Sequence, residues 1–438
     1  MRMKSGAVYR GIVAAGVAVV AALAAPAVGA ENLQDAWARA LVNDRGLAAV
    51  RSQAEAAQFD AAAARAQRWP TLAVGGGYTW LDDAPAFDFG FTGLPIKPPE
   101  LFDGNDFAMG TATLSVPVFT GGRISSGIAA AEARGRGAGA QALGAEQDLK
   151  LAVAESYVGV LRARKALAVA DSNVRTLEAL AGDIGAMFER ELVPKNDLLA
   201  VEVALADARQ NRLRAANAAE IAQAAYNRRL GEPLDRPAAI EDGVPAPQAL
   251  PADLDALVQQ ALERRTELAM LGEQARAYGQ LAKAERARLL PQVSVSGGYN
   301  YLENQFLDDD AFAMAGVGVQ WALFDGGQSR KRASALERSR RATEEQRADV
   351  ESLIALQVRQ AWLEIDETEQ RVRVTANAVA QAEENLRIAR ERYGAGLGTQ
   401  TQLLEAETLR VRALTNRDDA ELDAGLARLR LARAVGAL

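Results

Sequence analysis

The chain contains two copies of one structural unit, and this internal repeat limits the folds available to it more than any other feature of the sequence. Residues 31–70 align with residues 252–291 at a constant offset of 221, so that Leu41 matches Leu262 and Pro70 matches Pro291. From residue 107 onward the offset is 205, because residues 81–107 of the first copy hold sixteen extra residues. That segment is rich in Pro, Gly and Asp, which is typical of a surface loop.

Each copy predicts the same order of elements: a helix, a β-hairpin, a very long helix and a shorter helix. We expect residues 1–30 to be a signal peptide, residues 31–230 to form the first repeat and residues 252–438 to form the second. The proline-rich stretch 231–251 is the predicted linker at the waist of the molecule, since no helix can continue through it.

The predicted strands alternate apolar with small or polar residues, as strands with two different faces do. The hairpins span 71–119 and 292–324, and Leu72, Val74, Tyr78 and Trp80 share one face of the first strand. Strands of about ten residues with aromatic residues near the loop ends are typical of a transmembrane barrel, whereas a half-buried soluble hairpin is the alternative. Four strands cannot close a barrel, so we expect three chains to supply twelve.

The long helix of each copy carries a heptad pattern of apolar residues, which predicts coiled-coil packing. In the second copy this series is Val358, Ile365, Val372, Val379, Leu386 and Tyr393. About 65 residues of helix extend about 100 Å, the scale of a cell-envelope gap. We expect the shorter helices 31–69 and 196–230, and likewise 252–289 and 400–434, to stack end to end beside each long helix.

The N-terminus and the overall charge narrow the possible location and partners. Arg2, Lys4 and Arg10 precede the uncharged run 11–25 and small residues up to Ala30, a pattern that predicts cleavage near Ala30; a retained membrane anchor is the alternative. Loss of three cations changes the formal charge from −7 to −10, which argues against nucleic acid as a partner.

Composition leaves little material for catalysis. The sequence has no cysteine and no histidine, which removes the common nucleophiles, haem and iron–sulfur ligands and zinc sites. The acidic residues are scattered along helix faces without a convergent pair, so we expect no enzyme, no metal site and no cofactor.

Two copies of a helix–hairpin–helix–helix unit, with hairpins returning through Phe119–Gly122 and Phe324–Gly327, resemble the TolC family of outer-membrane efflux proteins. The family's tip signature is matched by residues 392–396 and 402–406, and more weakly by Phe188 and residues 196–199. The resemblance implies a mainly α fold with membrane β: a trimeric 12-stranded β-barrel, with four strands per protomer, continued by a long antiparallel α-helical coiled-coil barrel.

The resemblance also implies functional residues at the periplasmic tip. Tyr393 falls where an aromatic residue helps to latch the closed tip, while Gln402 and Glu405 fall where the family often places pore-lining acids. Asp197 belongs to the corresponding segment of the first copy. A solvated charge on a helix face is the alternative for Glu405, and Gly398 stands where some relatives have a basic latch residue.

The two tip turns are the expected contacts with an adaptor protein, although simple interhelical turns are the alternative. The residues concerned are Leu192, Val193, Pro194, Gly396, Leu397 and Gly398.

The function that the resemblance implies is passive conduction through the outer membrane of a Gram-negative bacterium. The expected partners are two further copies of the chain, a periplasmic adaptor (membrane fusion) protein, an inner-membrane RND, ABC or other pump, and outer-membrane lipid. A tripartite efflux pump and a type I secretion system both fit. The rival hypothesis is a non-conducting structural or adhesive outer-membrane coiled-coil protein.

Overall fold

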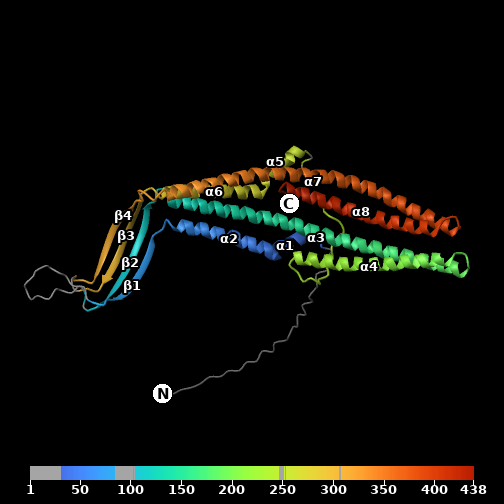
Figure 1. Cartoon of the computed structure of the whole chain (residues 1–438), viewed down its shortest axis with the longest axis horizontal. Helices are drawn as coiled ribbons and strands as arrows, with labels where there is room; N and C mark the ends of the chain where they lie inside the picture. Colours follow the sequence, from blue (N-terminus) through green and yellow to red (C-terminus); the bar gives the residue numbers. More distant parts are fainter. Residues whose placement is uncertain (1–30, 84–101, 103, 246–250, 252, 305–306) are drawn as a thin grey trace, which may run out of the picture.

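The computed structural model describes residues 31–83, 102, 104–245, 251, 253–304 and 307–438. The expected signal peptide and most of the insertion between the first two strands lie outside these residues. The molecule is a long rod with a β-sheet at one end and two helical turns at the other (Figure 1). Its elements are α1 (Leu33–Asn43), α2 (Arg45–Ala66), β1 (Thr71–Trp80), β2 (Asp106–Phe119), α3 (Arg123–Glu189), α4 (Lys195–Arg229), α5 (Leu254–Arg264), α6 (Thr266–Ala287), β3 (Gln292–Leu302), β4 (Ala311–Gln320), α7 (Gln328–Gly394) and α8 (Gln400–Ala434).

The helices of the two copies match residue for residue. α1 and α5 have 11 residues, α2 and α6 have 22, α3 and α7 have 67, and α4 and α8 have 35. Each helix of the second copy begins 221 or 205 residues after its counterpart, in agreement with the two offsets in the sequence. At 1.5 Å per residue, α3 and α7 each extend about 100 Å.

The four strands form one antiparallel sheet in the order β1-β2-β3-β4. The two hairpins share one register: Thr71 pairs with Ser115 in the first, and the corresponding Gln292 pairs with Gln320 in the second. β1 and β4 are the edge strands, and many of their apolar side chains are exposed: Leu72, Val74, Tyr78, Trp80, Phe312, Met314, Val317 and Val319. The backbone groups on the outer edges of β1 and β4 have no strand partner within the described chain.

The helices lie side by side along the rod. Near the sheet, α2, α3, α6 and α7 pack in that order, and beyond the waist α3 pairs with α4 while α7 pairs with α8 (Figure 1). The predicted end-to-end arrangement of shorter helices beside a long one is therefore confirmed. None of the described helices is both long enough and apolar enough to cross a membrane.

The expectation of unbroken helices over 31–69 and 252–289 is wrong. The chain leaves helical geometry at Asp44, whose carboxylate accepts a hydrogen bond from the Leu47 N–H at 2.7 Å and so caps α2. The corresponding break lies at Arg265, between α5 and α6. Each of these two segments therefore consists of two helices, separated at the waist by one residue in extended conformation.

The heptad positions form much of the helical core. Val153, Val160 and Val358 are fully buried, and Val174, Val379 and Leu386 are also buried, at 5–8% exposure. Other members of the two series, such as Leu167, Ile365 and Val372, are half-buried. One core cluster lies at the waist and a second joins both helix pairs near the tip. Both clusters include residues of α3, which runs as one helix from the waist to the tip.

The described linker residues are held against the waist by a small polar network. Glu31 forms a parallel β-bridge with Ile240, and the Tyr157 hydroxyl donates to the main-chain carbonyl of Glu241 at 2.7 Å. The Tyr226 hydroxyl donates to the Glu31 carboxylate at 3.0 Å. Burial is the main cause that raises the pKa of Tyr157 to about 12, so its hydroxyl remains a donor at neutral pH.

Candidate functional site

The end of the rod farthest from the sheet consists of two turns at corresponding positions. After α3, the Leu192 N–H donates to the Met187 carbonyl at 2.9 Å, and after α7 the Leu397 N–H donates to the Arg392 carbonyl at 2.8 Å. Both are helix C-caps that place one residue in the left-handed conformation. In the second copy that residue is Gly396, whereas in the first it is Glu191 with φ 59°, which is strained for a side chain with a Cβ.

A hydrogen bond joins the two helix pairs at the tip. The Tyr393 hydroxyl, at the end of α7, donates to the Asp197 carboxylate, in the first turn of α4, at 3.2 Å. The buried side chain of Gln400 donates to the main-chain carbonyl of the same aspartate. The structure thus brings together two of the predicted site residues, which lie 196 positions apart in the sequence.

The environment of Tyr393 favours its neutral, donating form. Burial and the adjacent charge of Asp197 raise the pKa of the Tyr393 hydroxyl to about 12. The hydroxyl therefore keeps its proton, and can donate to Asp197, well above physiological pH.

The other two predicted site residues lie on the first turns of α8. Gln402 and Thr399 form a capping box: the Thr399 hydroxyl accepts from the Gln402 N–H at 3.3 Å, and the Gln402 side chain accepts from the Thr399 N–H at 3.2 Å. Glu405 is exposed and forms no ion pair within the described chain. Gln402 thus has a local structural role here, and Glu405 presents a free carboxylate.

A buried ion pair beneath the tip was not anticipated from the sequence. Glu407 is 3% exposed, and its carboxylate accepts from the Arg410 guanidinium at 2.6 Å. Arg410 also donates to the Thr176 hydroxyl of α3 at 3.4 Å, which connects the two helix pairs. The Glu407 hydrogen bonds raise the pKa of Arg410. The Glu–Arg spacing of three residues was the available signal, but such spacing is common on solvated helix faces.

Apolar side chains pack around these polar contacts at the tip. Side chains from all four helices form one cluster: Val174, Leu177, Leu180 and Ile184 of α3, Val201, Leu205 and Ala208 of α4, Leu386 of α7, and Leu403 and Ala406 of α8. Separating α7 and α8 from α3 and α4 would expose this cluster. The contact between the two helix pairs is therefore stabilised by burial as well as by the Tyr393–Asp197 hydrogen bond.

The turns themselves expose apolar side chains. Leu192 is 67% exposed and Leu397, its counterpart in the second copy, is 72% exposed. Val193 packs against the tip cluster, whereas the exposed Pro194 occupies the N-cap position of α4 without a side-chain capping hydrogen bond. A Cβ at Gly398 would lie 3.2 Å from the Tyr393 backbone nitrogen, so this glycine allows the second turn to close tightly.

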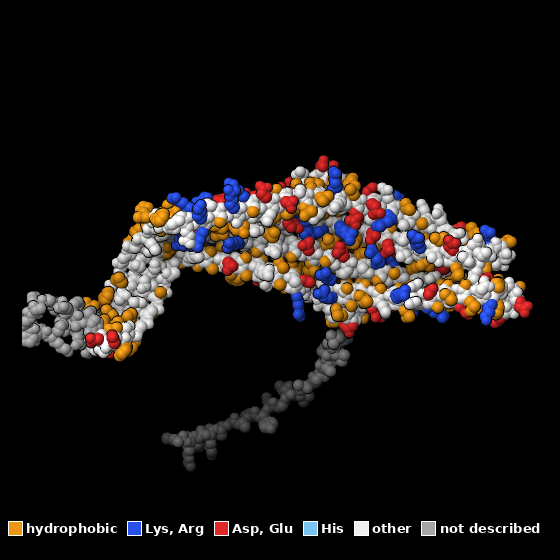
Figure 2. All heavy atoms as spheres, in the orientation of Figure 1, with side chains coloured by type: hydrophobic (Ala, Val, Ile, Leu, Met, Phe, Trp, Pro, Cys, Tyr) orange, Lys and Arg blue, Asp and Glu red, His pale blue; other side chains and the backbone are white. Residues whose placement is uncertain are grey.

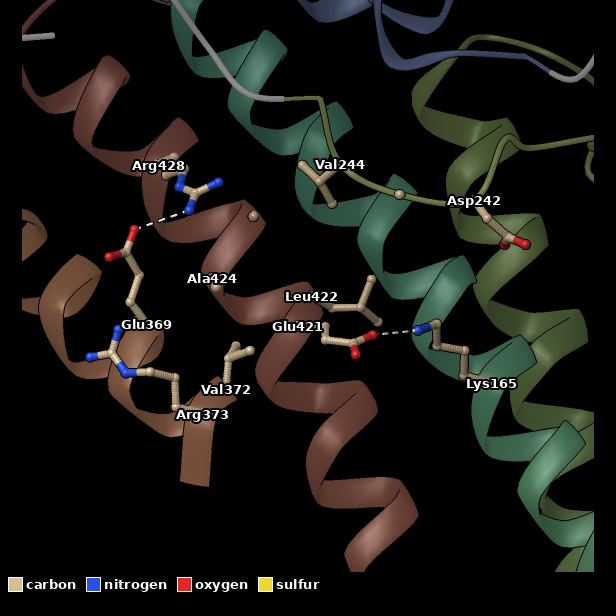
Figure 3. A pocket seen from close by; sticks show the side chains of 12 residues that line it. Lys165, Asp242, Val244, Glu369, Val372, Arg373, Glu421, Leu422, Ala424 and Arg428 are labelled. Carbon is tan, nitrogen blue, oxygen red and sulfur yellow. Dashed lines mark hydrogen bonds and ion pairs between the residues drawn. The ribbon is translucent and has the colours of Figure 1, made fainter. Parts of the chain in front are cut away.

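A second feature is an open cavity of about 710 Å³ at the waist, between α3, α7, α8 and the linker. Figure 3 shows that two of its cations are paired, Lys165 with Glu421 at 3.1 Å and Arg428 with Glu369 at 3.0 Å. Val244 of the linker lies over α8 at Gly425, where an added Cβ would be 2.6 Å from the valine side chain. The linker residues 242–244 form one wall of this cavity.

The described residues contain no group of three or more acidic side chains placed to hold a metal ion. The two ends of the rod expose different side chains: apolar ones at the sheet, and both apolar and charged ones at the tip. Figure 2 shows side chains of both charges spread over the helical part of the visible face, and few charged side chains on the sheet.

The same architecture occurs in solved outer-membrane proteins. VceC from Vibrio cholerae superimposes with a TM-score of 0.79 at 19% identity, over 92% of this chain and 96% of that chain. The CmeC channel of Campylobacter jejuni gives 0.81 at 13%, covering 93% and 86%. The open-state MtrE channel of Neisseria gonorrhoeae gives 0.73 at 18%, covering 92% and 88%. No significant match was found among curated protein sequences.

These likenesses define the class: the chain has the fold of an outer-membrane channel of the TolC type, with membrane strands continued by a helical coiled coil. The sequence profile of the outer membrane efflux proteins matches residues 37–232 and 257–437. The chain therefore belongs to the outer membrane efflux protein family. This confirms the predicted fold and the resemblance on which it rested.

Proposed function

We propose that three copies of the chain form a channel that passively conducts substrates from the periplasm across the outer membrane of a Gram-negative cell, in a tripartite efflux pump or a type I secretion system. The observation that carries this proposal is the incomplete sheet. Its four strands end in two unpaired edges and expose apolar side chains on β1 and β4. Exposed backbone edges are costly in lipid, and closure of the sheet by further copies removes them.

The helical layer supports the same assembly. α2 and α7 are its outer helices near the sheet, directly beyond the edge strands β1 and β4. Three copies arranged around an axis would continue both the sheet and the helical layer as closed tubes. Twelve strands leave a lumen wide enough for solutes, and the free energy of transport comes from the inner-membrane pump.

We propose that the tip is the gate. The Tyr393–Asp197 hydrogen bond and the apolar tip cluster hold α7 and α8 against α3 and α4 in the closed state. A threefold ring of Glu405 carboxylates at the aperture would favour cations. The exposed leucines of the two turns, Leu192 and Leu397, are the proposed contact with a periplasmic adaptor, whose binding would separate the helix pairs.

Conductance of the purified mature protein in a planar lipid bilayer tests this function. The proposal expects trimers in detergent and discrete channel openings that are cation-selective. Trimers that insert into lipid without any conductance, also in variants that loosen the tip, would support the rival hypothesis of a structural or adhesive surface protein. A monomer that is soluble without detergent would refute both.

A further inference from the structure

The internal repeat supplies a template for the contact between neighbouring chains. Within one chain, the first copy meets the second through β2 and β3 and through α3 and α6. In a closed ring, the second copy of one chain must meet the first copy of the next through β4 and β1 and through α7 and α2. We infer that this contact between chains repeats the contact within the chain, residue by residue. Adding 205 to a residue of β2 or α3, and subtracting 221 from its partner in β3 or α6, gives the corresponding pair between chains. This inference rests on the proposed trimer.

The structure shows that the offsets are accurate to a single residue within the sheet. Thr71 pairs with Ser115 in the first hairpin, and the offsets convert this pair into Gln292 and Gln320. That is the pair observed in the second hairpin. The same conversion can therefore be applied to the pairing of β2 with β3.

The conversion gives a definite strand register between chains. Ala112 pairs with Tyr299 inside the chain, which corresponds to Val317 of one chain opposite Tyr78 of the next. In this register the odd-numbered residues of β4 lie opposite the even-numbered residues of β1, and the even-numbered residues of β4 lie opposite the odd-numbered ones. The apolar face of β4 (Ala313, Ala315, Val317, Val319) therefore continues into the apolar face of β1 (Leu72, Val74, Tyr78, Trp80), which a shift by one residue would prevent.

The helical layer yields an ion pair at the same contact. Inside the chain, Gly144 of α3 lies so close to α6 that an added Cβ would be 2.7 Å from the Thr266 hydroxyl. The corresponding residues are Asp349 of α7 and Arg45 of α2, which carry opposite charges. Both are exposed, and neither forms an ion pair within the described part of its own chain. Each therefore has a charge free for the neighbouring copy.

The segments that connect the sheet to the helices give a further contact between neighbouring chains. Gly121 lies against Leu290 inside the chain, where an added Cβ would be 2.7 Å from the leucine Cβ. The corresponding residues are Gly326 and Trp69. Within the protomer an added Cβ at Gly326 would meet nothing within 4 Å, and Trp69 is 70% exposed. The geometry places the indole of one chain over this glycine of the next.

Disulfide mapping tests the register, because the natural chain has no cysteine and gives no background. Val317→Cys is combined in turn with Gly76→Cys, Tyr78→Cys and Trp80→Cys. Opposed residues in an antiparallel pair have Cα atoms about 4.5–5.5 Å apart, within disulfide range, whereas a shift of two residues separates them by roughly 8 Å. The positive control is Tyr78→Cys with Ala108→Cys, a pair within one hairpin that forms no bond between chains.

We expect the Tyr78→Cys combination to give covalently linked chains at least tenfold faster than the other two. Conducting trimers that cross-link instead through Gly76→Cys or Trp80→Cys would overturn the register while leaving the proposed function intact. Absence of any oligomer would overturn both.

Charge exchange tests the helical contact independently. Asp349→Arg or Arg45→Asp alone should lower the trimer fraction several-fold, and the double variant should restore it. Arg412→Asp, which reverses an exposed charge on α8, is the matched control. Failure of the double variant to recover would refute the Asp349–Arg45 pair.

Discussion

Replacing Tyr393 by phenylalanine tests the proposed gate most directly. The Tyr393→Phe change keeps the ring in the tip and removes only the hydroxyl that donates to Asp197 at 3.2 Å. A hydrogen bond to a carboxylate contributes about 1.5–3 kcal/mol, and we take about 1 kcal/mol here because the pair is partly exposed to water. One protomer would then favour the open state about fivefold more, and three protomers opening together about 150-fold.

Single-channel recording measures this shift as an increase in open probability. Tyr278→Phe is the matched control, because the Tyr278 hydroxyl makes no hydrogen bond within the described chain and lies on α6, far from the tip. Asp197→Asn, alone and combined with Tyr393→Phe, completes a double-mutant cycle in which the two effects should not add. If Tyr393→Phe channels open no more often than wild type and Tyr278→Phe, the hydrogen bond does not hold the gate.

The same bond gives a dependence on pH whose sign follows from the Tyr393 pKa. This pKa is raised from 10 to about 12, so the contribution to the closed state is complete below pH 10 and is lost as pH rises through about 12. Wild-type channels should therefore stay closed at mildly alkaline pH and should open more often as pH rises through about 12. Tyr393→Phe channels should lack this rise in open probability.

Three further changes test local features of the fold. Glu191→Gly should raise the free energy of unfolding by about 1 kcal/mol, because glycine adopts the left-handed conformation without strain, and Gly396→Ala should lower it by a similar amount; thermal unfolding in detergent measures both. Arg433→Ala should destabilise the waist by about 3 kcal/mol, because Arg433 is buried and bonds Asp148 at 2.7 Å and Glu267 at 3.0 Å; a loss below 1 kcal/mol would contradict a structural role. Gly425→Ala should push Val244 off α8 and increase proteolysis in the linker, and Val244→Gly should reverse this increase in the double variant.

Burial opposes the ionised form of Glu267, but hydrogen bonds that include those from Arg265 and Arg433 lower its pKa below 4.5 overall. Its contribution to stability is therefore present above that value and is lost as pH falls through the lower, folded-state pKa. In Glu267→Gln the free energy of unfolding should therefore fall less on acidification than it does in wild type.

The secondary-structure elements and their order could be predicted from the sequence because each element occurs in both copies of the repeat. Periodicity located the strands and the coiled-coil seam, and the offsets located corresponding residues such as Gln292 and Thr71. The breaks at Asp44 and Arg265 were missed because their signals are weak: an aspartate three residues before a leucine in one copy, and no side-chain cap in the other. Apolar periodicity continues across both breaks.

Side-chain partnerships between distant helices could not be predicted in the same way. The Glu407–Arg410 pair looks like any solvated helical pair in the sequence, and its burial depends on α3, whose Thr176 lies 234 residues away. The contact of Tyr226 with Glu31 likewise depends on how the chain wraps around the waist. Such contacts are set by the rotation of long helices about their axes, which heptad positions define only roughly.

At the tip the two copies of the repeat differ at the residues that form the hydrogen bond. Tyr393 corresponds to Phe188, which lacks the hydroxyl, and Asp197 corresponds to Gln402, which lacks the charge and caps α8. The tip bond therefore takes its donor from the second copy and its acceptor from the first, and the reciprocal pair cannot form. A ring of six similar tips would thus carry three bonds, each within one protomer. The proposed closed gate therefore has threefold symmetry, although its walls consist of six similar helix pairs. Breaking the one bond in a protomer would allow α7 and α8 to separate together from α3 and α4.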